Sequence, residues 1–203
     1  MHEVVANAQD DPAWLRNALM VTAPAIVADY SDAAAVLALE WYSEIRSESP
    51  VSTIYDPSPM KTVTDVDARA AVARAFDVDA EVARAVANLD GELEMLVADG
   101  FRETVVGNTR EDPDAVGWKR HANSGACKFC LMLAAKGAVY TEDTARFAAH
   151  PNCYCIAGPA IGGKEIWAEA TPMQYLASER ERTPEQKKEL RAYLNKNYPD
   201  APG

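Results

Sequence analysis

The chain has 203 residues, of which 48% are hydrophobic and 25% charged, a composition that is typical of a folded globular protein and excludes an intrinsically disordered one. The formal net charge of −11 disfavours broad nucleic-acid binding, which needs a basic patch to neutralise phosphates. No run of 18 or more apolar residues occurs, and the start of the chain lacks a basic segment followed by an apolar one. We therefore expect no transmembrane helix, no secretory signal and folding in a cytoplasm.

Two helices are predicted at the start of the chain. The first begins at Asp11-Pro12, because Asp accepts backbone hydrogen bonds at a helix start and Pro suits the first helical position. Pro24 is expected to kink or split this helix, since it lacks a backbone N–H. Ser31-Asp32 is expected to cap a second helix, which is apolar around much of its circumference and so predicts burial between partners. The apolar-face positions at helical spacing are Trp14, Leu15, Leu19, Thr22 and Ile26, then Val36, Leu39, Trp41, Tyr42 and Ile45.

An extended connector is predicted over residues 47–64, because three prolines and several serines disfavour a helix there. A short edge strand over residues 51–55 is a further expectation for this connector.

More helix is predicted from Asp65 onward, in two segments separated by a cap at Asp77. The longer segment carries an apolar stripe, in which Gly91 and Gly100 are each expected to cost up to about 1 kcal/mol relative to alanine. The pattern breaks over residues 107–117. The stripe consists of Leu89, Leu93, Leu96, Val97, Phe101 and Val105.

All four cysteines and one of the three histidines lie within residues 127–155, as Cys127-x2-Cys130 followed by His150-x2-Cys153-x-Cys155. Pairs of N and S donors separated by two residues can surround one ion, which is the usual arrangement of a structural zinc site. We therefore predict structural zinc and name all five residues as candidate ligands. Cys153 is preferred as the fourth ligand because it repeats the two-residue spacing, with Cys155 buried beside the site, although either sulfur can complete the set.

Other interpretations of the cluster stay open. A disulfide between its two halves is disfavoured by a cytoplasmic origin. A redox pair at Cys-x2-Cys is disfavoured because no predicted strand precedes it. A nucleophilic Cys130 with His150 as its base lacks an identifiable orienting group and oxyanion hole. His121, in a stretch predicted as a loop, is a spare ligand candidate that we expect at the surface.

Short elements are predicted around the cluster. Residues 130–137 predict a short helix with Gly137 at its C-cap, and residues 138–140 a short strand. A helical turn over residues 141–150 is expected to deliver the histidine. A flexible stretch is predicted over residues 157–164. Two further helices are expected to start at the Thr-Pro pairs of residues 171–172 and 183–184, the last one being either a solvated charged helix or a docking arm.

Residues 117–159 resemble the characteristic segment of the MuF-like minor capsid proteins, also called phage head morphogenesis proteins, of tailed bacteriophages, in the form found in phages of actinobacteria. A looser likeness is the Ala-rich helix that ends in Tyr42-x3-Arg46. The residues that match the family's pattern are Cys127, Cys130, Leu133, Ala134, Gly137, Tyr140, His150, Cys153, Cys155 and Pro159.

The resemblance implies a virion component that is made in the host cytoplasm and incorporated at the portal vertex or inner capsid during head assembly. The implied partners are the portal protein, the major capsid protein or both, with packaged DNA nearby but not strongly bound, and no membrane. The chain shows no protease-like Ser/His/Asp set, so we expect no catalysis. The alternative is a cysteine-dependent redox or hydrolytic enzyme that uses Cys127, Cys130 and His150.

The expected fold is mainly α with a small α+β Cys/His knuckle, long helices in the N-terminal half and two short C-terminal helices. The predicted regions are an N-terminal helical region (1–46), an extended connector (47–64), a second helical region (65–116), the Cys/His knuckle (117–160) and C-terminal helices or an arm (161–203).

Overall fold

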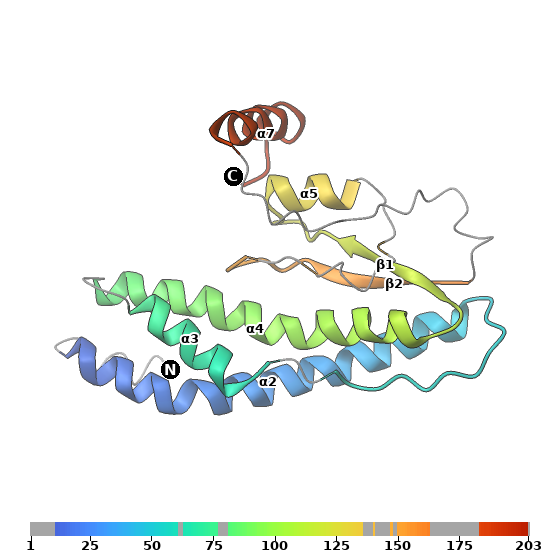
Figure 1. Ribbon diagram of the computed structural model, residues 1–203, viewed down its shortest axis with the longest axis horizontal. Coiled ribbons are helices and arrows are strands. Elements are labelled where there is room, and N and C mark those ends of the chain that lie inside the picture. Colours follow the sequence, from blue (N-terminus) through green and yellow to red (C-terminus); the bar gives the residue numbers. More distant parts are fainter. Residues whose placement is uncertain are drawn as a thin grey trace.

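The computed structural model describes residues 11–60, 63–76, 81–135, 140, 147, 150–162 and 183–202. Within these residues a layer of three helices lies against a two-stranded antiparallel sheet, a short helix covers the other side of the sheet, and the last helix stands beyond it (Figure 1). The mainly α prediction with a small α+β unit is confirmed. The elements are α2 (Pro12–Glu48), α3 (Asp65–Ala75), α4 (Val82–Glu111), β1 (Ala115–His121), α5 (Lys128–Ala135), β2 (Ile156–Ile161) and α7 (Pro184–Asn197).

Helix α2 is one continuous helix of 37 residues. Asp11 caps it as predicted, with its carboxylate accepting from the N–H of Trp14 at 2.9 Å. Pro24 was predicted to kink or split the helix; the split is wrong, because α2 continues through Pro24, and so is the second start at Ser31-Asp32. Proline in a helix interior costs about 3 kcal/mol, but buried residues on both sides of Pro24 pack this stretch onto α3 and α4 and offset that cost.

Burial along α2 follows a narrower face than predicted. Leu15, Leu19 and Tyr42 are buried, whereas Trp14 and Ile26 are exposed despite their place in the predicted stripe. By length and composition α2 is the one helix in the described part of the chain that is apolar enough to cross a membrane. Of the most apolar window of this helix, 33% is buried inside the protein.

Two hydrophobic cores lie on opposite ends of α4. The first is aliphatic and joins α2, α3 and α4, a group that we call the helical layer. The second joins α2 and α4 to the sheet and contains aromatic rings and sulfur. The first core comprises Leu15, Leu19, Ala23, Val27, Val63, Ala68, Ala71, Val72, Ala75, Leu89, Leu93 and Leu96. The second comprises Ala38, Tyr42, Val105, Val106, Trp118, Ala126, Cys130, Tyr140, Phe147, Cys153, Cys155, Ala157 and Ile161.

The connector before α3 is extended, as predicted, and its residues 51–55 contain no strand. Asn108 of α4 pins it: its side-chain oxygen accepts from the Tyr55 hydroxyl at 2.8 Å and from the Ser58 N–H at 2.9 Å. These bonds explain why α4 runs on to Glu111 although residues 107–117 were predicted to break the pattern. The polar side chains of its last turns find partners in the connector and do not end the helix.

The sheet pairs β1 with β2, and Trp118 lies opposite Pro159 in the register. Two predictions fail here. Residues 157–161 were expected to be flexible but form β2, and the stretch around His121 was expected to be a loop but ends β1. A strand therefore does precede the Cys-x2-Cys pair. Both misses have one cause, since each strand depends on a partner some 40 residues away in sequence.

Helix α7 begins with the predicted cap, a capping box between Thr183 and Gln186. None of its described side chains is buried, in keeping with an exposed charged helix. The expected caps at Asp77 and Gly137 and the helix starting at residue 171 lie outside the described residues, and of the turn predicted over residues 141–150 the structure describes residues 147 and 150 alone. Among residues 138–140, the structure describes Tyr140, which forms an isolated bridge with Trp118.

Candidate metal centre

The first half of the centre is the turn that leads into α5. Cys127 stands directly before the helix and Cys130 lies in its first turn. Burial acts to raise the pKa of the Cys127 thiol, but hydrogen bonds from the Cys130 N–H, from His150 in its protonated form and from the Phe129 N–H together lower this pKa below its ordinary value. Backbone N–H groups that point at a sulfur stabilise the thiolate, which is the form that binds a metal.

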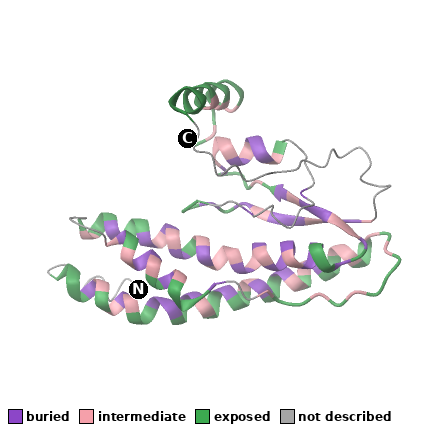
Figure 2. Cartoon of the chain, in the orientation of Figure 1, coloured by how far each residue is buried: buried purple, intermediate pink, exposed green. Residues whose placement is uncertain are grey.

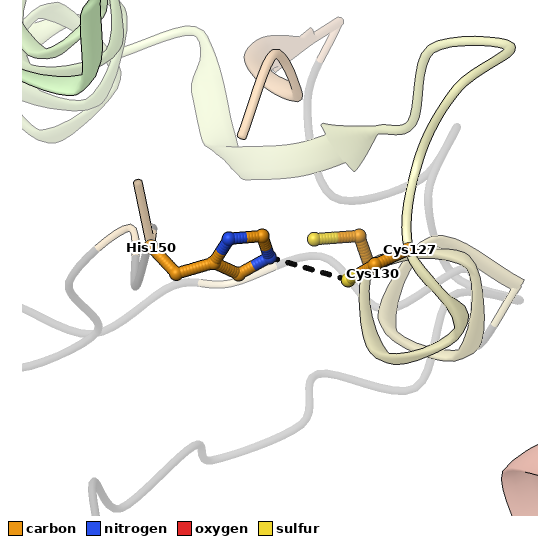
Figure 3. A group of neighbouring side chains, drawn as sticks. All are labelled: Cys127, Cys130 and His150. Carbon is orange, nitrogen blue, oxygen red and sulfur yellow. Dashed lines mark hydrogen bonds between the residues drawn. The ribbon is translucent and has the colours of Figure 1, made fainter. Parts of the chain in front are cut away.

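The second half is the turn that contains His150, Cys153 and Cys155. The Cys153 N–H donates to the His150 carbonyl at 3.0 Å and closes the turn. Nδ1 of His150 lies 2.8 Å from the Pro151 carbonyl oxygen, which can only accept, so Nδ1 carries the hydrogen. In the neutral ring Nε2 then has a free lone pair, and it faces the sulfur of Cys127 at 3.2 Å (Figure 3). Metal-binding histidines are commonly fixed in this way.

The donors fall into two overlapping groups that share Cys130. In one group Cys127, Cys130 and His150 place their ligand atoms within 4.8 Å of one another, and in the other Cys130, Cys153 and Cys155 do so. All five residues line one cavity of about 210 Å³. The structure therefore brings together the five residues that the spacing singled out. His121 belongs to neither group; it is exposed at the end of β1 and rests on Gly158.

The spacing of the sulfurs fits an ion better than a disulfide. The Sγ atoms of Cys130 and Cys153 are 3.7 Å apart. Two thiolates at about 2.3 Å from a tetrahedral zinc ion are separated by roughly 3.8 Å, whereas a disulfide needs about 2.05 Å. All four cysteines are free thiols. Soft sulfur donors with one imidazole match the ligand preference of zinc, so the residues present fit such an ion.

The three buried thiols of the centre differ in the direction in which their pKa values are shifted. Cys130, Cys153 and Cys155 are buried, while Cys127 is half-buried and His150 exposed. A hydrogen bond from Cys130 lowers the pKa of Cys153, with the charge of Arg102 acting in the same direction. The same bond raises the pKa of Cys130. These opposite shifts favour the thiolate at Cys153 over the thiolate at Cys130.

Arg102 of α4 holds the second half of the centre in place through hydrogen bonds. Its guanidinium is fully buried and donates to the carbonyl oxygens of Cys153 and Cys155, the latter at 2.9 Å. Asp99 neutralises it through an ion pair of 2.9 Å. A buried guanidinium is costly unless every donor is paired, so these carbonyls and this carboxylate define where the cysteine segment lies.

Arg120 of β1 approaches the centre from the other side. Its guanidinium lies 3.8 Å from the centroid of the Phe147 ring and donates toward the Cys130 sulfur at 3.8 Å. A cation beside sulfur ligands offsets the negative charge that several thiolates bring to one site. Sequence reasoning identified neither arginine, because the buried face of β1 and the contacts of α4 depend on distant segments.

The Tyr42-x3-Arg46 motif has a structural role. The Tyr42 hydroxyl donates to Asp112 at 3.1 Å, and Arg46 forms ion pairs with Asp112 at 2.9 Å and with Asp114 at 3.1 Å. Burial, and then the negative charge of Asp112, raise the pKa of Tyr42. Asp114 in turn accepts from the backbone and hydroxyl of Thr53. This network ties the end of α2 to the connector and to the start of β1.

A model of the family described as VG15 protein matches residues 1–179. The matched span contains the helical layer, the sheet and all five residues of the candidate metal centre. The comparison with curated proteins and the comparison with solved structures each gave no match.

Proposed function

The chain belongs to the VG15 protein family, a phage gene family, and is thus a phage protein; from this premise we propose that it is a minor capsid protein of the MuF-like, head-morphogenesis kind. In this proposal the chain acts without catalysis. It is made in the host cytoplasm, enters the virion at the portal or inner capsid, and supports head assembly and genome packaging or ejection.

The observation that carries the proposal is the meeting of five soft donors from two segments that are separate in sequence. They are the residues on which the resemblance to MuF-like proteins depends. Cys127, Cys130, His150 and one of Cys153 and Cys155 would hold a zinc ion. Bound there, zinc supplies a cross-link and no reactive position, because four protein ligands complete its coordination.

The acidic charge is in keeping with this role. A net charge of −11 disfavours broad adhesion to packaged DNA through phosphate contacts, so the chain can work beside the genome while it contacts other proteins. The portal protein, the major capsid protein or both are the proposed partners, and no membrane is involved.

Two measurements test the proposal. Native mass spectrometry of the full chain, purified without chelator, is expected to show one zinc ion per chain, and mass spectrometry of purified phage heads is expected to detect the chain in few copies. Heads that lack the chain would overturn the virion role. A chain that carries no metal after growth in zinc-supplemented medium would overturn the zinc site while leaving the virion role to the second measurement.

A thiol-dependent enzyme is the second candidate, and two observations favour it. Cys127 is half-buried, borders the cavity, and has the Nε2 of His150 at 3.2 Å, which is the geometry of a cysteine paired with a base. Strand β1 also precedes the Cys-x2-Cys pair, as in redox folds.

Alkylation rates distinguish the two candidates. An enzyme is expected to show one thiol that reacts well below pH 8 and disappears in Cys127→Ser. A zinc site is expected to react slowly until a chelator is added, after which several thiols react together.

A further inference from the structure

The C-terminal segment, by which we mean α7 and residues 198–202, reaches the candidate metal centre although it lies far from it in sequence. Helix α7 is almost wholly exposed (Figure 2), and its described contacts are with α5. Pro202, beyond the end of α7, lines the cavity that the five donors share. The segment begins after residue 179, where the match to the family model ends. It therefore adds to the metal centre a wall that the matched span does not contain.

The first contact is made in the first turn of α5. The first N–H groups of a helix have no partner within the helix. Those of Phe129 and Cys130 donate to the sulfur of Cys127. The N–H of Lys128 donates instead to the carbonyl oxygen of Pro202 at 3.1 Å. The C-terminal segment thus supplies a backbone partner inside the turn that presents Cys127 and Cys130.

The second contact ties the same residue to α7 itself. The ammonium group of Lys128 donates to the side-chain oxygen of Asn195 at 2.8 Å. A turn after α7 brings Pro202 back toward α5, and the N–H of Ala201 closes this turn by donating to the Tyr198 carbonyl at 3.3 Å. Both contacts therefore act on the residue that follows the first cysteine of the Cys-x2-Cys pair.

An ion and a segment that fix the same turn stabilise each other. A metal ion bound by Cys127 and Cys130 would hold the backbone of Lys128 in place, so the C-terminal segment would lose less conformational freedom when it docks. By linkage, the docked segment raises the affinity for the ion by the same factor by which the ion favours docking. One hydrogen bond corresponds to about 2–10-fold in such an equilibrium constant.

We infer that the C-terminal segment is a strap of the metal centre, which holds Lys128 and so positions the turn that carries Cys127 and Cys130. Asn195 and Pro202 are thus positioning residues of the metal site, and α7 stays docked while the ion is bound. The inference rests on the zinc site of the proposed function and is independent of the virion role.

Zinc affinity of full-length variants tests the strap, once native mass spectrometry has shown that they carry zinc. Ala201→Pro removes the N–H that closes the turn, and Asn195→Ala removes the acceptor of the Lys128 ammonium. The double variant is expected to bind zinc about tenfold more weakly in competition with a chelator. The matched control is Asn197→Ala, which removes a side chain that bonds within α7 and should leave the affinity unchanged.

Cleavage by trypsin gives a second readout, because it reports whether α7 is docked. The helix offers the exposed cleavage sites Lys187, Lys188 and Arg191. Cleavage follows the population of the open form, so the zinc-loaded double variant should be cut there about tenfold faster than the zinc-loaded wild type. After chelation the two chains should be cut at the same rate, because the segment is then undocked in both.

Each outcome decides the question. Weaker zinc binding together with faster cleavage of α7 supports the strap. A double variant with wild-type affinity overturns the strap and leaves the proposed function standing, as does an equal loss in Asn197→Ala. A loss of amide hydrogen-exchange protection throughout α2 and α4 also overturns it, because the substitutions would then act on the whole fold. A wild-type chain without zinc overturns the zinc site and the strap together, and leaves the virion role to the measurement on phage heads.

Discussion

The helical layer and the Cys/His knuckle, by which we mean β1, α5, residues 150–155 and β2, share α4 but are held together differently. The core of the helical layer around Leu15, Val72 and Leu89 is aliphatic and needs only the burial of apolar surface. In the knuckle, sulfur atoms take core positions beside Trp118 and Phe147, and buried arginines reach the same segments. From this difference we expect the layer to fold by itself, and the knuckle to depend on a metal ion held by its sulfur atoms.

Removal of the metal is expected to have the largest effect, and it should fall on one region. The binding free energy of structural zinc in small metal-bound folds is about 10–16 kcal/mol. After chelation, amide hydrogen exchange is therefore expected to lose its protection in β1, α5 and β2 but to keep it in α2 and the first half of α4. Equal loss of protection in both regions would contradict the division.

Substitution of Arg102 is expected to have the next largest effect. Arg102→Met leaves Asp99 and two cysteine carbonyls without their partner, so it should cost about 3–5 kcal/mol of unfolding free energy and lower zinc affinity about 10–100-fold. Chemical denaturation and competition with a zinc chelator measure the two effects. The control is Arg74→Met, which breaks the more exposed pair with Glu92 and should cost less than about 1 kcal/mol.

A cavity in the aliphatic core should destabilise the helical layer and leave the Cys/His knuckle unchanged. Leu89 is 1% exposed, and Leu89→Ala is expected to cost about 2–5 kcal/mol of unfolding free energy. Zinc affinity should stay within twofold of the wild type, because the substitution lies outside the sulfur-containing core. A variant that is destabilised and also loses zinc affinity would show that the two cores act as one.

The smallest expected effect is a pH-dependent one at the start of α3. Hydrogen bonds from the hydroxyl and N–H of Thr64 lower the pKa of Asp67 below its ordinary value of 3.8. The stabilisation by this carboxylate is therefore present above about pH 4 and is lost as the pH falls through the lowered pKa. Asp67→Asn should cost about 1 kcal/mol at pH 7, and the difference from the wild type should shrink below pH 4 in denaturation curves. A difference that does not vary with pH would point to lost packing.

Local patterns predicted much of the helical layer and the start of α7. The caps at Asp11 and Thr183 depend on neighbouring residues and could be predicted, as could the stripe that includes Leu89. Pro24 misled the prediction, because the burial that carries the helix through it comes from α3 and α4. Which apolar side chains of α2 are exposed could not be predicted either, since such side chains lie around much of the circumference of its second half and gave no sign of which side faced the core.

In the candidate metal centre, residue type and spacing identified the five donors, because two-residue spacing is itself a local geometry. The residues that fix their positions could not be found in this way. Arg102 looks like an ordinary charged residue in a helix, and only the fold brings it beneath the carbonyls of Cys153 and Cys155. Arg120 and Trp118 lie two residues apart and both face the buried side of β1. This spacing has meaning only once that stretch is known to be a strand.

Gly91 lies where the knuckle rests on α4. Asn152, which has a left-handed backbone with φ of 63°, donates its N–H to the Gly91 carbonyl at 3.4 Å. A Cβ on Gly91 would lie only 2.6 Å from the Asn152 side-chain nitrogen. Positions 91 and 152 should therefore vary as a pair among homologous chains. Where α4 carries a larger residue at position 91, we expect a smaller residue at position 152. The helical layer and the Cys/His knuckle are thus expected to change together at this contact.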